Sequence, residues 1–155
     1  MAGNEPAPVL IAYDGSDFAK GAVAEAANQL AAGRRAIVLT VSEPLGGIPY
    51  FGAAGAPVEP ETVEGLIDAA KESAQKVAEE GAELARDAGL DAESLVAIGG
   101  PIWNLIVEAA DQQGADLIVI GSRGRSGLAH VLLGSVAAAV AQHSKRSVLI
   151  VHPRA

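Results

Sequence analysis

The chain contains no cysteine and few aromatic residues, and its charge is predominantly negative. Without cysteine there can be no disulfide and no thiolate metal site, and nothing in the composition argues for export. Lysine and arginine total 11 against 19 acidic residues, a formal net charge of −8, which disfavours a general affinity for nucleic acid. Aromatic residues make up 3%, too few for a base-stacking surface. Any anionic ligand must therefore be held by local features of the chain.

Long hydrophobic segments are also lacking. The apolar run VLIAY near the N-terminus is too short for a signal peptide, and no basic segment precedes it. Residues 126–144 carry no Asp, Glu, Lys or Arg, but their Gly, Ser, His and Gln suit a buried helix better than a membrane span. The length of 155 residues is that of one domain with a sizeable core. We therefore expect a single cytoplasmic domain, residues 1–155, that binds neither membranes nor nucleic acid.

Short apolar runs alternate with helical patterns along the chain. The runs are continuous, as in strands buried on both faces of a parallel sheet, and cover residues 9–13, 36–41, 94–98, 117–120 and 148–151. The helical patterns cover residues 17–32, 61–88, 101–113 and 134–143. This alternation predicts an open three-layer α/β sandwich around a five-stranded parallel sheet.

The longest helical pattern has the clearest period, and two other segments have none. Its apolar stripe, the face expected to be buried, consists of Val63, Leu66, Ile67, Ala70, Ala74, Val77, Ala78, Leu84 and Ala85. Pro101 fits the first turn of the next helix. Residues 42–59, SEPLGGIPYFGAAGAPVE, are rich in Gly and Pro and predict a long loop that is functional or mobile. Residues 1–7 are expected to form a flexible tail.

Chemically informative residues follow the first and fourth apolar runs. The first is followed by Asp14, Gly15 and Ser16, and the fourth by GSRGRSGLAHVLLGS at residues 121–135. In open α/β sheets, ligands bind beyond the carboxyl ends of the strands. A carboxylate there can accept hydrogen bonds from ribose hydroxyls or help to hold a metal ion. Glycines and a helix N-terminus let main-chain N–H groups approach phosphate oxygens. Together these features predict a nucleotide site.

The spacing of the second segment is more specific than its composition. Two familiar phosphate-binding motifs are absent, because no G-x-G-x-x-G follows the first run and no Lys completes a Walker loop. The pattern G-x₂-G-x₉-G-S is present at Gly121, Gly124, Gly134 and Ser135. At this composition about 0.02 occurrences are expected by chance, and the pattern also falls directly after a predicted strand.

These segments resemble the universal stress protein family, specifically its nucleotide-binding branch. The resemblance runs from VLIAYDGS through LTVSEP and the glycine pattern to VLIVH. It implies a Rossmann-like, adenine nucleotide alpha hydrolase-like fold with the strand order 3-2-1-4-5. That order sets the first and fourth strands side by side, as Asp14 and Gly121 need if they are to form one site. A flavodoxin-like order, 2-1-3-4-5, would separate them.

The resemblance also implies roles for individual residues. Asp14 matches the acidic residue beside the nucleotide, and Val41 matches the position whose main chain meets adenine. Six further residues match the family's positions that bind the ribose and the triphosphate: Gly121, Arg123, Gly124, Gly134, Ser135 and Val136. Arg125 is a further candidate in the same loop, with solvated surface as its alternative. The implied ligand is ATP with Mg²⁺ or Mn²⁺, which Asp14 would help to hold.

Structural roles compete with these assignments. Asp14 can cap the first helix, a role for which Ser16 is at least as good, and isolated glycines are commonly turn residues. The three histidines match no metal-ligand spacing and are expected to be structural or exposed: His130, His143 and His152. Trp103 is expected to pack in the core. For Tyr50 and Phe51, in the long loop, a minor hydrophobic cluster is favoured over a cover for the adenine.

The function expected from the sequence is that of an ATP-binding, nucleotide-dependent regulator of a stress response. The resemblance implies a homodimer that pairs through the fifth strand, residues 148–151. One alternative is a weak ATPase or phosphoryl-transfer enzyme that uses the same site, although His130 is the only candidate base between Gly121 and Ser135. The other alternative is an interaction protein of the same fold without nucleotide, against which the intact glycine pattern argues.

Overall fold

Five strands form a single parallel sheet in the computed structural model, which describes residues 3, 5–44, 59–125 and 133–154. The strands are β1 (Val9–Ala12), β2 (Arg35–Ser42), β3 (Asp91–Ile98), β4 (Leu117–Gly121) and β5 (Ser147–Val151). The helices are α1 (Asp17–Gln29), α2 (Pro60–Asp87), α3 (Ile102–Gln112) and α4 (Ser135–His143). The strand order β3-β2-β1-β4-β5 confirms the predicted fold class and topology.

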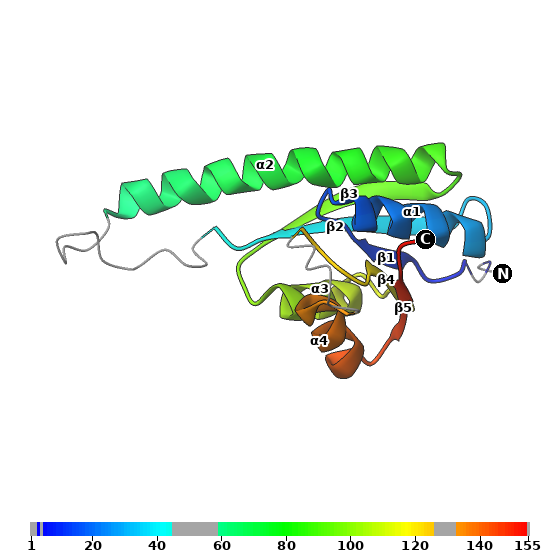
Figure 1. Ribbon diagram of the computed structural model, residues 1–155. Helices are drawn as coiled ribbons and strands as arrows, with labels where there is room; N and C mark the ends of the chain where they lie inside the picture. Colours follow the sequence, from blue (N-terminus) through cyan, green and yellow to red (C-terminus); the bar gives the residue numbers. More distant parts are fainter. Residues whose placement is uncertain (1–2, 4, 45–58, 126–132, 155) are drawn as a thin grey trace.

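The helices cover both faces of the sheet (Figure 1). Helices α1 and α2 pack on one face over Val9 and Ile11, and α3 and α4 pack on the other over Leu10 and Ile37. Neighbouring residues of β1 point to opposite faces, and Val9, Leu10 and Ile11 are all fully buried. This burial on two sides explains why the strands appear in the sequence as continuous apolar runs.

The position of β1 between β2 and β4 brings distant segments together. Ile11 pairs with Val38 on one side and with Val119 on the other. Because all the strands are parallel, the segments that follow β1, β2 and β4 leave the sheet at the same side, the one formed by the carboxyl ends of the strands. We call this side the carboxyl edge. The sheet thus places Asp14, Val41 and the segment after Gly121 near one another.

Helix α2 is longer than the sheet surface it covers. Its buried residues all lie in its second half: Ala74, Ala78, Gly81, Ala82 and Ala85. Gly81 fits closely here, since a Cβ would lie 2.7 Å from the Tyr13 ring. The first half extends past the sheet (Figure 1), and Leu66 is 40% exposed. Leu84 is 37% exposed, so the buried face expected from the period is wrong at these two leucines.

Three further boundaries differ from the sequence prediction. Helix α1 ends at Gln29, three residues before its predicted end. Helix α3 begins at Ile102, and Pro101 is its N-cap residue rather than part of its first turn. Strand β3 begins three residues earlier than predicted, at Asp91, and pairs with β2 over its whole length. It lies at the edge of the sheet, where Asp91 and Glu93 are exposed, so its start lacks the apolar signal of a central strand. No described helix is both long and apolar enough to cross a membrane.

Candidate functional site

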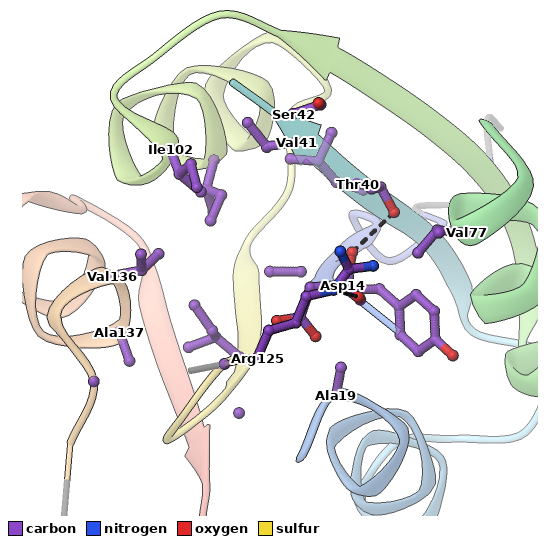
Figure 2. A pocket seen from close by; sticks show the side chains of 18 of the residues that line it. Asp14, Ala19, Thr40, Val41, Ser42, Val77, Ile102, Arg125, Val136 and Ala137 are labelled. Atoms are coloured by element: carbon purple, nitrogen blue, oxygen red, sulfur yellow. Dashed lines mark hydrogen bonds between the residues drawn. The ribbon is translucent and has the colours of Figure 1, made fainter. Parts of the chain in front are cut away.

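A cavity of about 520 Å³ lies at the carboxyl edge of the sheet (Figure 2). Its walls come from the ends of β1, β2 and β4 and from residues of all four of these helices. Every residue that the sequence nominated for the site lines it: Asp14, Val41, Gly121, Arg123, Gly124, Arg125, Gly134, Ser135 and Val136. Four separate segments of the chain therefore converge on one cavity, as the strand order requires.

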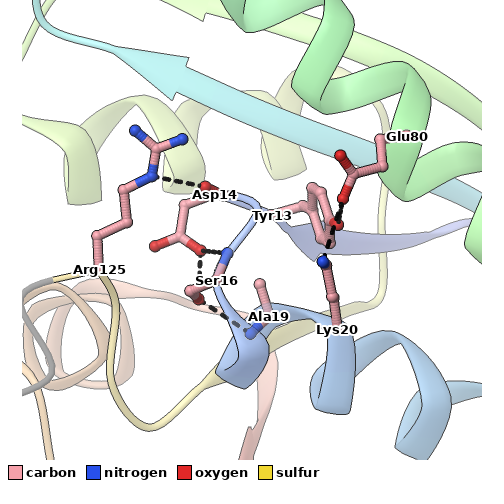
Figure 3. A network of polar contacts seen from close by, with 7 residues as sticks. All are labelled: Tyr13, Asp14, Ser16, Ala19, Lys20, Glu80 and Arg125. Carbon is pink, nitrogen blue, oxygen red and sulfur yellow. Dashed lines mark hydrogen bonds and ion pairs between the residues drawn. The ribbon is translucent and has the colours of Figure 1, made fainter.

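At the end of β1, hydrogen bonds orient Asp14 (Figure 3). Its Oδ1 accepts bonds from the main-chain N–H of Ser16 at 3.0 Å and from the Ser16 hydroxyl at 2.5 Å. The Ser16 hydroxyl oxygen in turn accepts the N–H of Ala19 and caps α1. Capping therefore belongs to Ser16. The second carboxylate oxygen, Oδ2, faces Gly124, where a Cβ would lie 3.1 Å from it.

The three glycines of the motif are required by space rather than by turn geometry. None of them has a positive φ. A Cβ at Gly121 would lie 3.1 Å from the Phe18 carbonyl oxygen, and one at Gly134 would lie 3.2 Å from the Ser122 carbonyl oxygen. The Gly134 N–H donates to that same Ser122 carbonyl at 2.6 Å. The glycines bring the end of β4, the start of α4 and Asp14 into close contact.

Helix α4 presents its N-terminus to the cavity. Gly134 is its N-cap residue, no side chain of the described residues caps it, and Ser135, Val136 and Ala137 of its first turn line the cavity. The first N–H groups of a helix have no partner within the helix, and they carry a partial positive charge. This helix end suits an anion.

Two arginines flank the same end of the cavity. Arg125 is exposed, and its Nε donates to the main-chain carbonyl of Asp14 at 2.8 Å, as Figure 3 shows. The Arg123 guanidinium lies 5.5 Å from the centre of the Phe18 ring, a cation–π contact. Within the described residues, the buried Nε of Arg123 and the buried hydroxyl of Ser122 have no hydrogen-bond partner. Both arginines line the cavity together with the first turn of α4.

The main chain of Val41 faces the cavity from the end of β2. The Leu39 carbonyl accepts the Tyr13 N–H on the β1 side, whereas the Ser42 carbonyl accepts the Gly99 N–H on the β3 side. Main-chain groups alternate in direction along a strand, so the N–H and C=O of Val41 point to the β1 side. The paired register of β1 and β2 ends at Ala12 and Leu39. Val41 thus directs one donor and one acceptor past the end of β1.

Apolar side chains surround this part of the cavity, and sequence reasoning missed most of them. They come from β1, β2, β4, α3 and α4: Ala12, Leu39, Ile102, Ile106, Ile120 and Ala137. Helix α2 contributes a further wall of Ala70, Ser73, Ala74 and Val77. Ala70, Ala74 and Val77 belong to the apolar stripe that the period identified, whereas Ser73 does not. A period cannot tell a core contact from a cavity wall. Thr40, the single polar residue in the second apolar run, was the one available signal in β2.

A second polar contact joins α2 to Tyr13, which also lines the cavity. The Tyr13 hydroxyl donates to Glu80 Oε1 at 2.5 Å, and Lys20 Nζ lies 3.7 Å from the same oxygen (Figure 3). Burial and the neighbouring Glu80 carboxylate raise the pKa of Tyr13 above its ordinary value. The contact ties α2 to the strand that carries Asp14.

The remaining candidates divide as follows. Trp103 packs on the α3–α4 side of the core and stacks on His143, with ring centres 4.2 Å apart, which confirms its structural assignment. His152 is exposed. His130, Tyr50 and Phe51, and most of residues 42–59, lie outside the described residues. Within the described ranges, no group of three or more His, Asp or Glu residues could hold a metal ion.

The sequence and the fold both match known proteins. The sequence model of the universal stress protein family covers residues 7–152. Universal stress protein YxiE of Bacillus subtilis is 37% identical over 154 aligned positions, which cover 92% of this chain and 97% of that protein. The chain therefore belongs to the universal stress protein family.

Solved structures extend this comparison. A universal stress protein crystallised in complex with cAMP is 33% identical, with a TM-score of 0.64 over 97% of this chain and 99% of that one. The protein MJ0577 of Methanocaldococcus jannaschii, at 24% identity, has a TM-score of 0.77 over 97% of this chain and 98% of its own. The second match shows the shared fold.

Proposed function

We propose that this universal stress protein binds ATP at the carboxyl edge of its sheet and acts as a nucleotide-dependent regulator in the cytoplasm. The observation that carries the proposal is the convergence of Asp14, Val41 and the glycine motif on one cavity. A relative at 33% identity holds cAMP, which has the same base and ribose. The regulatory role rests on family membership.

Each part of the ligand has a matching part of the cavity. The adenine would lie against the apolar side chains near Ile102 and meet the main chain of Val41. The ribose hydroxyls would reach the Asp14 carboxylate, whose Oδ2 faces Gly124. The phosphates would lie at Gly124, Ser135 and the start of α4, where the first N–H groups of the helix and two arginines would offset their charge.

A divalent ion would complete this arrangement. Mg²⁺ is commonly held by one or two carboxylates together with phosphate oxygens of a nucleotide, and Mn²⁺ accepts the same ligands. One carboxylate oxygen of Asp14 is engaged by Ser16, and the other faces Gly124. That second oxygen fits an ion shared with the phosphates of ATP.

Calorimetry tests the binding proposal. Protein freed of nucleotide should bind ATP saturably with a stoichiometry near one per chain. Protein purified without that step, once denatured, should release an adenine nucleotide that anion-exchange chromatography identifies. Heat changes no larger than those of dilution, up to millimolar ATP, would overturn the proposal.

We propose binding without efficient catalysis. Rapid phosphoryl transfer needs either a catalytic base or a residue that orients the attacking water. The only carboxylates in the described lining are those of Asp14 and Glu43, and Asp14 is assigned to the ribose or the ion. In a single-turnover assay, most bound ATP should stay intact for minutes, far slower than the roughly 1–100 s⁻¹ of kinases. Complete hydrolysis within seconds would make the protein an ATPase.

We further propose a homodimer that forms through β5. This strand is at the edge of the sheet, and Val148, Leu149, Ile150 and Val151 are only partly buried. An edge strand offers unpaired main-chain groups to a second copy across a two-fold axis. Light scattering at micromolar concentration should report a dimer, and Leu149→Asp should convert it to a folded monomer. A monomeric parent would contradict the proposal.

A further inference from the structure

Thr40 is a buried polar residue whose hydroxyl has one clear partner. Its side chain is 6% exposed, and Oγ1 donates to the main-chain carbonyl of Tyr13 at 2.8 Å (Figure 2). This bond joins β2 to the residue that follows β1. It lies one residue before Val41 on β2 and one residue before Asp14 on the other segment.

The Thr40 hydroxyl donates to the carbonyl that a regular ladder would use for its next bond. Since Ala12 pairs with Leu39, Tyr13 lies opposite Thr40. The Tyr13 N–H donates to the Leu39 carbonyl, so the next bond of a regular parallel ladder would run from the Val41 N–H to the Tyr13 carbonyl. That carbonyl accepts the threonine hydroxyl instead, and the paired register stops at Ala12 and Leu39.

We propose that Thr40 is a positioning residue that sets base specificity by keeping the Val41 N–H available to the ligand. The inference rests on the proposed nucleotide function and adds to it the reason why the end of β2 can recognise a base. Without the hydroxyl, the buried Tyr13 carbonyl would need another donor, because buried acceptors are costly to leave unpaired. The Val41 N–H is the donor that the ladder supplies.

The chemistry of the base determines how the effect is measured. Val41 presents a donor N–H and an acceptor C=O on the same side of the strand. Adenine presents the complement on one edge, a ring nitrogen that accepts beside an exocyclic amino group that donates. Hypoxanthine, the base of inosine triphosphate, has a 6-oxo group and a protonated N1, which inverts both positions. ATP and inosine triphosphate carry the same ribose and phosphates, so the ratio of their affinities isolates the base edge.

The experiment compares Thr40→Val, which removes the hydroxyl at nearly constant shape, with Thr40→Ser, which keeps it. Dissociation constants for ATP and inosine triphosphate are measured by calorimetry for the parent and both variants. The parent should prefer ATP. Thr40→Val should lower the preference for ATP over inosine triphosphate, measured as the ratio of their dissociation constants, by about threefold to tenfold, which is the effect of one hydrogen bond. Thr40→Ser should retain the parent's preference.

The possible failures are distinguishable. If both affinities fall by the same factor in Thr40→Val, Thr40 is only structural and the inference is wrong. A parent that binds both nucleotides equally also overturns it, while nucleotide binding stands. A parent that binds neither overturns the proposed function itself. If Thr40→Val does not fold, hydrogen exchange at the Val41 amide of the parent protein is measured instead. ATP should slow this exchange. An unchanged exchange rate would contradict the inference.

Discussion

At the end of β1 the polar groups are bonded within the protein, whereas at the end of β4 several of them are not. Asp14 Oδ1, its main-chain carbonyl and the Tyr13 carbonyl accept bonds from Ser16, Arg125 and Thr40 respectively. Across the cavity, α4 has no side-chain cap, and the Arg123 Nε is buried without a partner in the described chain. Buried unpaired groups of this kind are rare in proteins.

The difference suggests a division of work between the two strand ends. The β1 end is oriented before any ligand arrives, so it can select the sugar and base without having to become ordered on binding. The β4 end holds donors that a phosphate would satisfy, in a space that glycines keep clear. Substitutions at the two ends should therefore have different consequences, which can be ranked by expected size.

The largest effect is expected at Gly134. Valine there places a Cβ about 3.2 Å from the Ser122 carbonyl and further methyl groups beside the start of α4. We expect ATP affinity to fall by about 100-fold, which corresponds to about 3 kcal/mol and is typical of overpacking a tight site. Gly65→Val is the matched control, because a Cβ at Gly65 meets nothing within 4 Å. Calorimetry on the folded variants measures both, and unchanged affinity in Gly134→Val would put the phosphates elsewhere.

A smaller loss, with a different dependence on metal, is expected at Asp14. Removing a charged hydrogen-bonding group with Asp14→Ala should cost about 1.5–3 kcal/mol of ATP binding, and Mg²⁺ should strengthen binding less in the variant than in the parent. Asp14→Asn retains an acceptor for Ser16 and replaces the other oxygen by an amide. It should therefore lose the metal effect while keeping the local turn.

Titrations with and without Mg²⁺ check this expectation, with Asp17→Ala as the control because Asp17 begins α1 outside the cavity lining. An Asp14→Ala protein that binds like the parent in both conditions would reduce Asp14 to a residue that orients Ser16.

The smallest effect is expected at the Tyr13 hydroxyl, which contacts Glu80 of α2. The phenol has a raised pKa in the folded protein, so its contribution to stability is present below the unfolded value of about 10 and is lost as pH rises toward the folded value. Tyr13→Phe should lower the free energy of unfolding by about 0.5–1.5 kcal/mol at neutral pH and leave ATP affinity unchanged. Above pH 10 the difference in free energy of unfolding between parent and variant should become smaller. Denaturant titrations at several pH values test this, and a constant gap would contradict it.

The sequence predicted the fold well because burial on both faces of a central strand leaves a strong local signal. β1, β2 and β4 lie within one or two residues of their predicted bounds, whereas β3 begins three residues early, since its first residues face solvent at the edge of the sheet. Leu66 and Leu84 were misjudged because a helical period shows which residues share a face but not how far the sheet extends beneath them.

In the site, too, some residues leave a local signal in the sequence and others depend on how distant segments pack. Asp14 and the glycine motif could be found in the sequence because their spacing is unusual and each follows a strand. Thr40 is visible in the sequence as a polar residue within an apolar run, but its role could not be predicted, because that role depends on the register at which β1 and β2 stop pairing. The α2 wall depends on where that helix crosses the carboxyl edge, which no local pattern encodes.

The central claim is that one ligand spans both strand ends, and amide chemical shifts measure this directly. On addition of ATP to ¹⁵N-labelled protein, the amides of Val41, Gly124 and Ser135 should shift together along a single saturation curve. Residues Leu149 to Arg154, which line a separate groove against α1, should respond far less. Shifts confined to that groove, or at only one of the two strand ends, would contradict the account.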